Sequence, residues 1–285
     1  MKEIIDIIPE IALGIQKITQ TDFSSNDLGT GVNKSGDDQV PLDVISDDFI
    51  FNIFKGLDCI YKVVSEEREN IDIINPDGEY SIAYDPLDGS SLVDVNLSVG
   101  TIFGIYKGEL ESKNLVGAAY IIYGPRLEIV YSMGENVKYF QNLGGIFVEK
   151  KIGNLKDKGK IVSPGGLKNR WKDYHSNLIS ELYDEEYTLR YSGAMIVELH
   201  HILLKGGGLH SYPELDGKPD GKLRKLFEVF PLAFIYEKLG GFGIDKNGTR
   251  LLDLDCKSIH EATSCYFGTK YEIEKVKKHL PSFSH

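Results

Sequence analysis

The chain has 285 residues, of which 41% are hydrophobic, and a formal net charge of −11. This length can bury a sizeable core and lies near the size at which one core divides into two. The acidic balance argues against non-specific binding to nucleic acid or to an anionic membrane, because both need a basic surface. The N-terminal apolar segment carries charges that a signal peptide lacks, and no stretch approaches the roughly 18 uncharged apolar residues of a membrane span. We therefore expect a soluble, cytoplasmic protein.

The first half of the chain alternates between helical and strand patterns. Residues 3–20 have isoleucines at helical spacing and predict an amphipathic helix, which Pro9 must either start or kink. A loop rich in Ser, Asn, Gly and Asp follows over 21–39, and helical spacing returns over 44–54. Apolar or alternating runs predict strands over 61–65, 80–84, 99–106, 116–123 and 127–132. This half is therefore expected to be α/β or α+β.

A charged, glycine-interrupted segment over 150–160 is the best candidate for a boundary within the chain. Beyond it, helical patterns cover 194–204 and 226–239, and Gly240 and Gly241 follow the second pattern where a helix C-cap is expected. We therefore predict two packed subdomains, 1–153 and 154–285.

Acidic residues gather where the predicted elements begin or end. The clusters are Asp37, Asp38 and Asp43; Glu66 and Glu67; Asp85 and Asp88; and Glu228. The middle two clusters each follow a strand pattern, so parallel or neighbouring strands would deliver their carboxylates to one edge of a sheet. Clustered carboxylates raise one another's pKa unless cations neutralise them. Oxygen ligands of this kind suit Mg²⁺ or Mn²⁺ rather than zinc.

The sequence DPLDGSS, residues 85–91, joins acidic residues to a glycine and two serines. Pro86 and Leu87 lie between the two aspartates and fix the turn, so both carboxylates and the Leu87 carbonyl can face one ion. The backbone N–H groups and hydroxyls of Gly89, Ser90 and Ser91 can hold a phosphate. A metal site beside a phosphate site indicates phosphoryl chemistry.

These motifs resemble a known family. DPLDGSS, with the SEE of residues 65–67 upstream, is similar to the metal-binding signature of the lithium-sensitive sugar and inositol phosphatases. With GDDQVPLDV, RYSGAM, SYP and GKLRKLFEVFPLAF, the chain resembles the class I fructose-1,6-bisphosphatases and sedoheptulose-1,7-bisphosphatases from about residue 35 to 270. The resemblance implies the layered α/β (α+β) fold of this superfamily, with the metal site between two packed subdomains. It also implies hydrolysis of the 1-phosphate of fructose 1,6-bisphosphate, giving fructose 6-phosphate.

The resemblance assigns the acidic residues to roles in catalysis. The metal ligands would be Glu66, Glu67, Asp85, Asp88, Glu228 and the Leu87 carbonyl, and they would hold two or more Mg²⁺ per site, for which Mn²⁺ can substitute. Asp38, Asp43 and Glu67 would position and deprotonate the attacking water.

The resemblance also supplies a substrate site and an assembly. Its residues would be Asp88, Gly89, Ser90, Ser91, Arg190, Tyr191, Met195, Tyr212, Lys222 and Arg224. Arg190 is expected to reach the site of a neighbouring subunit in a homotetramer or homodimer. The partners expected are thus a sugar bisphosphate and further copies of the chain, with neither nucleic acid nor membrane.

Three alternatives stay open. Residues 163–166, SPGG, replace the family's Asn-Glu-Gly-Tyr segment, and SPGG resembles the sedoheptulose bisphosphatase branch. A sedoheptulose-1,7-bisphosphatase or a dual-specificity enzyme is therefore possible on sequence grounds. An inositol monophosphatase-like enzyme is disfavoured because its substrate needs no site for a second phosphate. An inactive regulator that binds metal or sugar phosphate is disfavoured because all five metal carboxylates are present.

Overall fold

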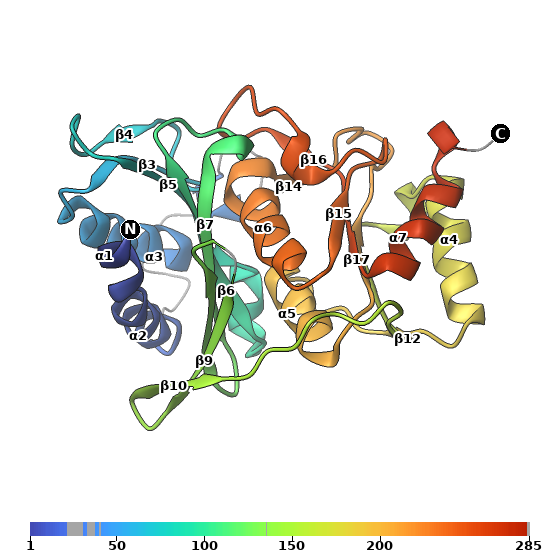
Figure 1. Cartoon of the computed structure of the whole chain (residues 1–285), viewed down its shortest axis with the longest axis horizontal. Helices are drawn as coiled ribbons and strands as arrows, with labels where there is room; N and C mark the ends of the chain where they lie inside the picture. Colours follow the sequence, from blue (N-terminus) through green and yellow to red (C-terminus); the bar gives the residue numbers. More distant parts are fainter. Residues whose placement is uncertain (22–30, 33–37, 40, 135, 284–285) are drawn as a thin grey trace.

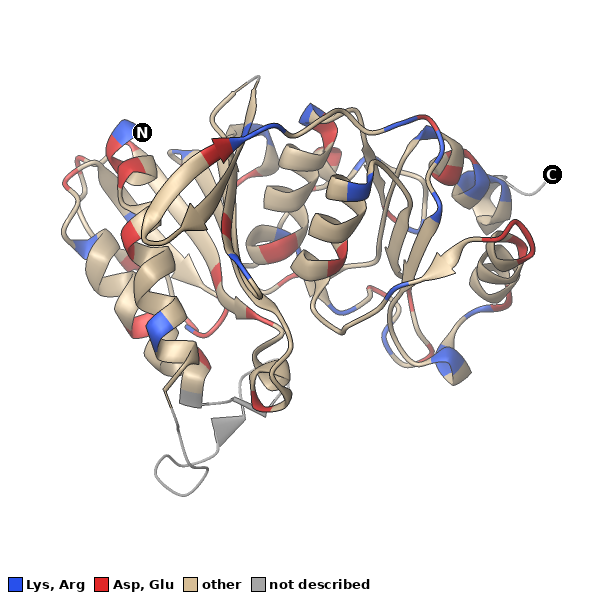
Figure 2. Ribbon diagram, turned by 90° about the horizontal axis from the view of Figure 1, so that it is seen from below, with Lys and Arg blue, Asp and Glu red and all other residues tan. Residues whose placement is uncertain are grey.

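The computed structural model describes residues 1–21, 31–32, 38–39, 41–134 and 136–283. Its elements form an α+β fold of five layers, in which two β-sheets alternate with three layers of helices (Figure 1). Lys and Arg are dispersed among Asp and Glu over both halves of the molecule (Figure 2). No helix of the described residues combines the length and the apolar character needed to cross a membrane.

The first helical layer consists of α1 (Lys2–Asp6), α2 (Ile8–Thr19) and α3 (Pro41–Lys55). The predicted single helix over 3–20 is broken at Ile7, and Pro9 lies in the first turn of α2, where a missing N–H costs no intrahelical hydrogen bond. The isoleucines of α1 and α2 pack, together with Ile50 and Phe54 of α3, on one face of the large sheet.

The large sheet has eight strands in the order β10-β9-β8-β7-β6-β5-β3-β4. Its strands are β3 (Ile60–Ser65), β4 (Asp72–Ile73), β5 (Tyr80–Asp88), β6 (Val99–Lys107), β7 (Leu115–Tyr123), β8 (Leu127–Ser132), β9 (Val137–Leu143) and β10 (Ile146–Lys150). All neighbours are antiparallel except β3 and β5, which run parallel. The sequence patterns identified five of these strands and missed the short β4 and the half-exposed β9 and β10.

The middle layer lies between the two sheets and contains α5 (Met195–Lys205) and α6 (Phe230–Lys238). The predicted helix over 226–239 differs at its start, because residues 225–229 form a π-helical turn, η4 (Lys225–Val229), before α6 begins. Pro231 has no N–H to donate to the preceding turn, and a wider turn accommodates that loss. Gly240, at φ +82°, follows α6 in the left-handed conformation expected after a helix C-cap.

The second sheet has five strands in the order β12-β11-β13-β17-β15. Its strands are β11 (Ile161–Pro164), β12 (Thr188–Leu189), β13 (Leu209–Tyr212), β15 (Phe242–Ile244) and β17 (Cys265–Gly268). The outer helices α4 (Asp173–Asp184) and α7 (Lys270–His279) cover its far face. Two-stranded ladders join β1 (Gly31–Val32) to β2 (Asp38–Gln39) and β14 (Leu223–Arg224) to β16 (Ala262–Thr263). The division at 153/154 stays a prediction.

Candidate active site

Two neighbouring strands end at the same place and bring together the acidic pairs Glu66–Glu67 and Asp85–Asp88. β3 and β5 are parallel, with Ser65 opposite Tyr84, and the Glu66 N–H donates to the Tyr84 carbonyl at 3.0 Å. Glu66 and Glu67 therefore leave β3 at the same sheet edge that Asp85 reaches on β5. The two strands are both neighbouring and parallel, which agrees with the expectation that parallel or neighbouring strands deliver these carboxylates to one sheet edge. β5 is longer than the predicted strand, because its pairing with β6 resumes at Asp88 after an irregularity that follows Asp85.

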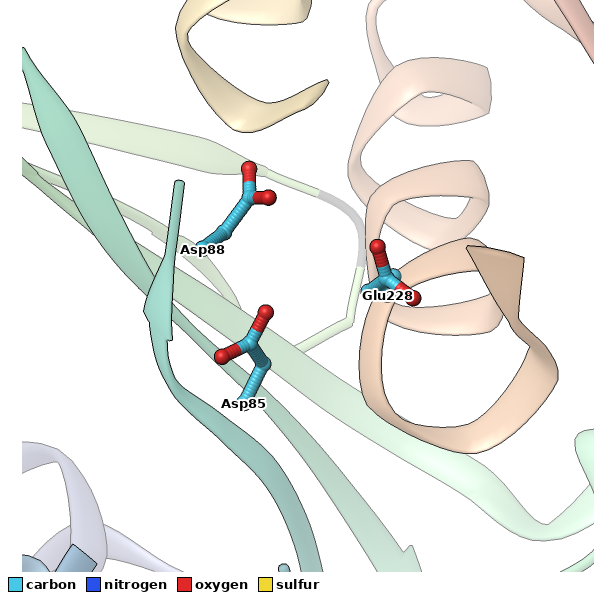
Figure 3. A group of neighbouring side chains, drawn as sticks. All are labelled: Asp85, Asp88 and Glu228. Atoms are coloured by element: carbon cyan, nitrogen blue, oxygen red, sulfur yellow. The ribbon is translucent and has the colours of Figure 1, made fainter. Parts of the chain in front are cut away.

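Three carboxylates form the centre of this edge. Asp85 and Asp88 from β5 face Glu228 from η4 (Figure 3). One oxygen of each lies within 4.8 Å of the others. Asp85 is 6% exposed and Glu228 is 4% exposed, so water reaches neither freely.

A backbone N–H orients each of the three carboxylates. Asp85 accepts a hydrogen bond from the Leu87 N–H at 2.9 Å, and Asp88 accepts one from the Ile196 N–H at 2.7 Å. Glu228 accepts from the Arg224 N–H at 2.6 Å. The three donors come from β5, α5 and β14, so packing of the middle layer against the large sheet fixes the cluster.

Burial and mutual repulsion make this cluster difficult to ionise. Burial, followed by the charges of Glu66, Asp88 and Glu228, raises the pKa of Asp85 well above its ordinary value. Burial raises the pKa of Asp88 to about 7, although the Ile196 N–H opposes the rise. Burial and the neighbouring Glu66 also raise the pKa of Glu228. The protein thus concentrates more negative charge here than its own groups offset.

The cluster fits a divalent cation. Its donors are all carboxylate oxygens, which are the ligands preferred by hard ions such as Mg²⁺ and Mn²⁺. The Arg224 guanidinium lies 3.2 Å from Glu66, at the border of the cluster. A bound cation would offset the repulsion that raises the three pKa values.

A cavity of about 570 Å³ opens beside the carboxylates. Most of the site residues expected from the sequence line it. They are Asp43, Glu66, Glu67, Asp85, Leu87, Asp88, Gly89, Ser90, Ser91, Tyr191, Met195, Tyr212, Lys222, Arg224 and Glu228. Acidic, aromatic and cationic residues thus line one cavity.

One expected residue, Arg190, is not brought to this cavity, and the placement of another, Asp38, is not described. The side chain of Asp38 lies outside the described residues, as does Asp37. Arg190 is exposed and does not line the cavity, and its guanidinium donates to the Leu189 carbonyl at 2.7 Å. Its expected reach into a neighbouring subunit stays a prediction.

The turn after β5 has a backbone conformation that favours glycine. Gly89 has φ +85°, and a Cβ at this position would lie 2.6 Å from the Cβ of Ala194. The glycine therefore lets η1 (Ser90–Val95) approach the segment before α5. The Ser90 hydroxyl then donates to Asp43 of α3 at 3.0 Å, which ties the turn to the first helical layer.

Glu198 of α5 organises the loop that carries Arg190 and Tyr191. It is 3% exposed. One of its carboxylate oxygens accepts hydrogen bonds from the Ser192 N–H and from the Ser192 hydroxyl, the latter at 2.7 Å. The other oxygen accepts from the Ser163 hydroxyl at 3.0 Å, and this hydroxyl also contacts the Arg190 carbonyl. A single buried carboxylate thus joins α5, β11 and the loop at the cavity.

Sequence reasoning missed several residues at or behind the site. Asp94, Gly193, His210 and Leu223 also line the cavity. The signal for His210 was its place two residues before Tyr212, since alternate residues of a strand share a face.

Asp47, which the sequence reasoning also missed, lies buried one helical turn after Asp43. It accepts hydrogen bonds from the Tyr84 hydroxyl and from Arg68 Nε, each at 2.6 Å. Its signal was the spacing of four residues that places two side chains on one helix face.

Models of two family domains match almost the whole chain. The fructose-1-6-bisphosphatase N-terminal domain matches residues 11–150, and the fructose-1-6-bisphosphatase C-terminal domain matches residues 155–281. The class 1 fructose-1,6-bisphosphatase of Campylobacter curvus is 48% identical over 283 residues, which cover 98% of this chain and 93% of that protein. The class 1 fructose-1,6-bisphosphatase of Helicobacter hepaticus is 48% identical over 277 residues, covering 96% and 98%.

Solved structures agree with these sequence matches. The holo form of Leishmania major fructose-1,6-bisphosphatase has a TM-score of 0.88 at 29% identity and covers 96% of this chain and 92% of that one. A putative sedoheptulose-1,7 bisphosphatase from Toxoplasma gondii also has a TM-score of 0.88, at 26% identity, covering 99% and 94%. By sequence and by fold, the chain belongs to the fructose-1,6-bisphosphatase family.

Proposed function

We propose that this protein is a metal-dependent phosphatase that hydrolyses the 1-phosphate of fructose 1,6-bisphosphate to fructose 6-phosphate and inorganic phosphate. The carrying observation is the cluster of Asp85, Asp88 and Glu228 in a cavity that aromatic and cationic residues also line. Such a cavity suits a sugar with a phosphate at each end. Membership of the family supports the same substrate.

The carboxylates of the cavity would hold two or more Mg²⁺, with Mn²⁺ as a substitute. The proposed ligands are Glu66, Glu67, Asp85, Asp88, Glu228 and the Leu87 carbonyl, all of which line the cavity. Bound divalent cations supply Lewis-acid stabilisation of developing negative charge and make water a stronger nucleophile.

Three acidic residues would manage the attacking water. Asp43, which accepts a hydrogen bond from the Ser90 hydroxyl at 3.0 Å, would orient the water toward the phosphorus. With Asp38 and Glu67, it would take the proton that the water loses. The backbone N–H groups of residues 89–91 would hold the phosphate oxygens in line with this attack.

The cationic and aromatic residues of the cavity would bind the sugar and the second phosphate. Lys222 and Arg224 supply positive charge, while Tyr191 and Tyr212 supply hydroxyl groups. Met195, at the start of α5, offers an apolar contact for the sugar carbons. A sugar with only one phosphate would have no second phosphate for these cations to bind, which disfavours inositol monophosphate as substrate.

Sedoheptulose 1,7-bisphosphate is a second candidate substrate. The fold matches the putative sedoheptulose-1,7 bisphosphatase of Toxoplasma gondii as closely as it matches a fructose bisphosphatase. The extra carbon of sedoheptulose gives a pocket only about 1–3 kcal/mol for discrimination. Turnover of both sugars by one site is therefore physically reasonable.

We also propose that the protein works as a homodimer or homotetramer. Arg190 is exposed, next to the exposed Leu189 and Tyr191, and is not among the described residues that line its own cavity. A neighbouring subunit that covers this surface would receive Arg190 at its substrate site.

Phosphate release by the purified protein tests the proposal. Fructose 1,6-bisphosphate and sedoheptulose 1,7-bisphosphate should be compared in Mg²⁺, in Mn²⁺ and in chelator. We expect cation-dependent release with kcat/KM favouring the fructose compound. Activity on both sugars that is no higher than that of Asp85→Asn would contradict a phosphatase function and favour an inactive sugar-phosphate-binding regulator.

A further inference from the structure

Two of the proposed cation ligands lie on a turn, whereas the other three carboxylates lie on β5 and η4. Glu66 and Glu67 are the central residues of this turn, which follows β3. The Arg68 N–H closes it by donating to the Ser65 carbonyl at 3.2 Å. Turns are more mobile than the strands and helices that they connect. The position of these two carboxylates therefore depends on the contacts that fix the Ser65–Arg68 turn.

The Arg68 side chain joins this turn to α3. Its Nε donates to Asp47 at 2.6 Å, and its Nη2 donates to Asp48 at 2.8 Å. Its Cζ lies 4.0 Å from the centroid of the Phe51 ring, so the guanidinium stacks on α3 as well as bonding to it. A planar guanidinium can make these contacts together because its donors form a rigid fork. Arg68 thus fixes the turn relative to the helix that carries Asp43.

The Arg68 backbone joins the same turn to the element that carries Glu228. The Arg68 carbonyl accepts a hydrogen bond from His260 Nε2 at 2.9 Å. The His260 ring packs on Phe227 of η4, the residue before Glu228, with ring centroids 5.4 Å apart. The other ring nitrogen, Nδ1, is buried and has no hydrogen-bond partner among the described residues, which costs free energy. The position that His260 imposes explains its place better than any stability it adds.

We infer that Arg68 and His260 are positioning residues, which hold the Ser65–Arg68 turn relative to α3 and η4 in the arrangement that cation binding needs. The inference rests on the proposed function and concerns residues behind the site, since neither is among those that line the cavity. Replacing a residue that orients metal ligands typically weakens metal binding by about 10–100-fold. The positive charge of Arg68 alone would act in the opposite direction, because it repels a divalent cation. Position and charge therefore predict effects of opposite sign.

The test compares Arg68→Gln with the matched control Arg250→Gln. Arg250 also bonds to two acidic residues, Glu237 of α6 at 2.7 and 2.8 Å and Asp253 at 2.7 Å, but it does not line the cavity. Calorimetry measures Mn²⁺ binding to each protein without substrate, and thermal unfolding in chelator measures stability. A third variant, His260→Phe, keeps an aromatic ring and loses the hydrogen bond to the turn. It also carries the test if Arg68→Gln does not fold.

We expect Mn²⁺ binding to weaken about ten-fold in Arg68→Gln and about three-fold in His260→Phe, which loses one neutral hydrogen bond. The Mg²⁺ concentration for half-maximal phosphate release should rise by similar factors. His260→Phe should melt at about the wild-type temperature, because it also removes the unpartnered Nδ1. A purely structural role would instead lower the melting temperature and leave Mn²⁺ binding unchanged.

Arg250→Gln should bind Mn²⁺ as the wild type does, even where its melting temperature falls. Unchanged or tighter Mn²⁺ binding by Arg68→Gln would overturn the inference, as would equal weakening by Arg250→Gln. If Arg68→Gln does not fold, wild-type Mn²⁺ binding by His260→Phe overturns it. Failure of the wild type to bind Mn²⁺ or to hydrolyse fructose 1,6-bisphosphate would instead overturn the proposed function.

Discussion

The buried carboxylate of Asp85 serves binding at the expense of stability. Burial and three neighbouring acids raise its pKa, which means that the ionised form destabilises the fold when no cation is bound. The same uncompensated charge is what gives a divalent cation its affinity. One residue therefore links the stability of the protein to its cation.

Replacing Asp85 by Asn should separate these two effects. We expect kcat/KM to fall by about 100-fold or more, because a ligand of the proposed cations is lost. In chelator at pH 8, the variant should melt about 3 °C higher than wild type, because repulsion within the cluster is relieved. Thermal unfolding with and without Mg²⁺ measures the second effect.

The control is Asp77→Asn, which removes an exposed carboxylate from the turn before β5. It should change neither activity nor the melting temperature in chelator. If Asp85→Asn melted lower than wild type in chelator, the charge of Asp85 would be offset by the protein itself, contrary to the geometry.

The burial of His175 predicts how stability responds to acid. Burial lowers its pKa to about 3 in the folded protein, against about 6.5 in the unfolded chain. Between these values the unfolded chain binds the extra proton, so the free energy of unfolding falls as the pH falls, by about 1.4 kcal/mol per pH unit. The contribution of the buried neutral His175 to the free energy of unfolding is fully present above pH 6.5.

Chemical denaturation of wild type and His175→Phe at pH 7 and pH 5 tests this. Lowering the pH from 7 to 5 should reduce the free energy of unfolding of the wild type by about 2 kcal/mol more than that of the variant. A difference that is equal at both pH values would mean that the imidazole is protonated inside the fold.

At the scale of elements, Glu198 connects α5 and β11 to the loop that carries Arg190 and Tyr191. Glu198→Gln keeps the shape of the side chain but weakens the charge-assisted hydrogen bonds to Ser192 and places a donor beside Ser163. We expect KM for fructose 1,6-bisphosphate to rise about ten-fold while kcat changes less than about two-fold, because the loop serves binding.

A matched variant is Glu181→Gln on α4, which is also tied by hydrogen bonds, to Lys275 and His279, but far from the cavity. It should leave both kinetic parameters unchanged. A fall in kcat at constant KM for Glu198→Gln would show that Glu198 acts on the chemical step instead.

Elements also show what the sequence could and could not predict. The strand ends that carry Glu66 and Asp85 were predictable, because apolar runs followed by acids are local patterns. The π-turn at Glu228 and the length of β5 were not, since they depend on Pro231 and on pairing with β6. His210 and Asp47 carried a local signal in their spacing from Tyr212 and Asp43, but their contacts come from segments far away in the sequence.

The whole molecule can be tested for a shared active site. If Arg190 serves the neighbouring subunit, a hybrid dimer of one Asp85→Asn chain and one Arg190→Ala chain contains one complete site. Such hybrids, purified through two different affinity tags, should have about half the activity of wild type. Each variant alone should have much less.

The control hybrid pairs a wild-type chain with a chain that carries both substitutions. With Arg190 acting across the interface, both of its sites are incomplete, and its activity should be low. High activity of this hybrid, with low activity of the first, would place Arg190 in its own subunit's site. A monomer in light scattering would contradict the assembly directly.

The shared middle layer has a consequence for how the chain can be divided. Tyr120 of the large sheet, Phe230 of α6 and Phe267 of the second sheet belong to one continuous apolar cluster. A protease that cut the connecting segment at 151–160 would break the backbone but not this cluster. The two fragments should therefore co-migrate as one particle until a denaturant separates them. Neither fragment expressed alone should remain monomeric and unaggregated, because each would expose its half of the interior to water.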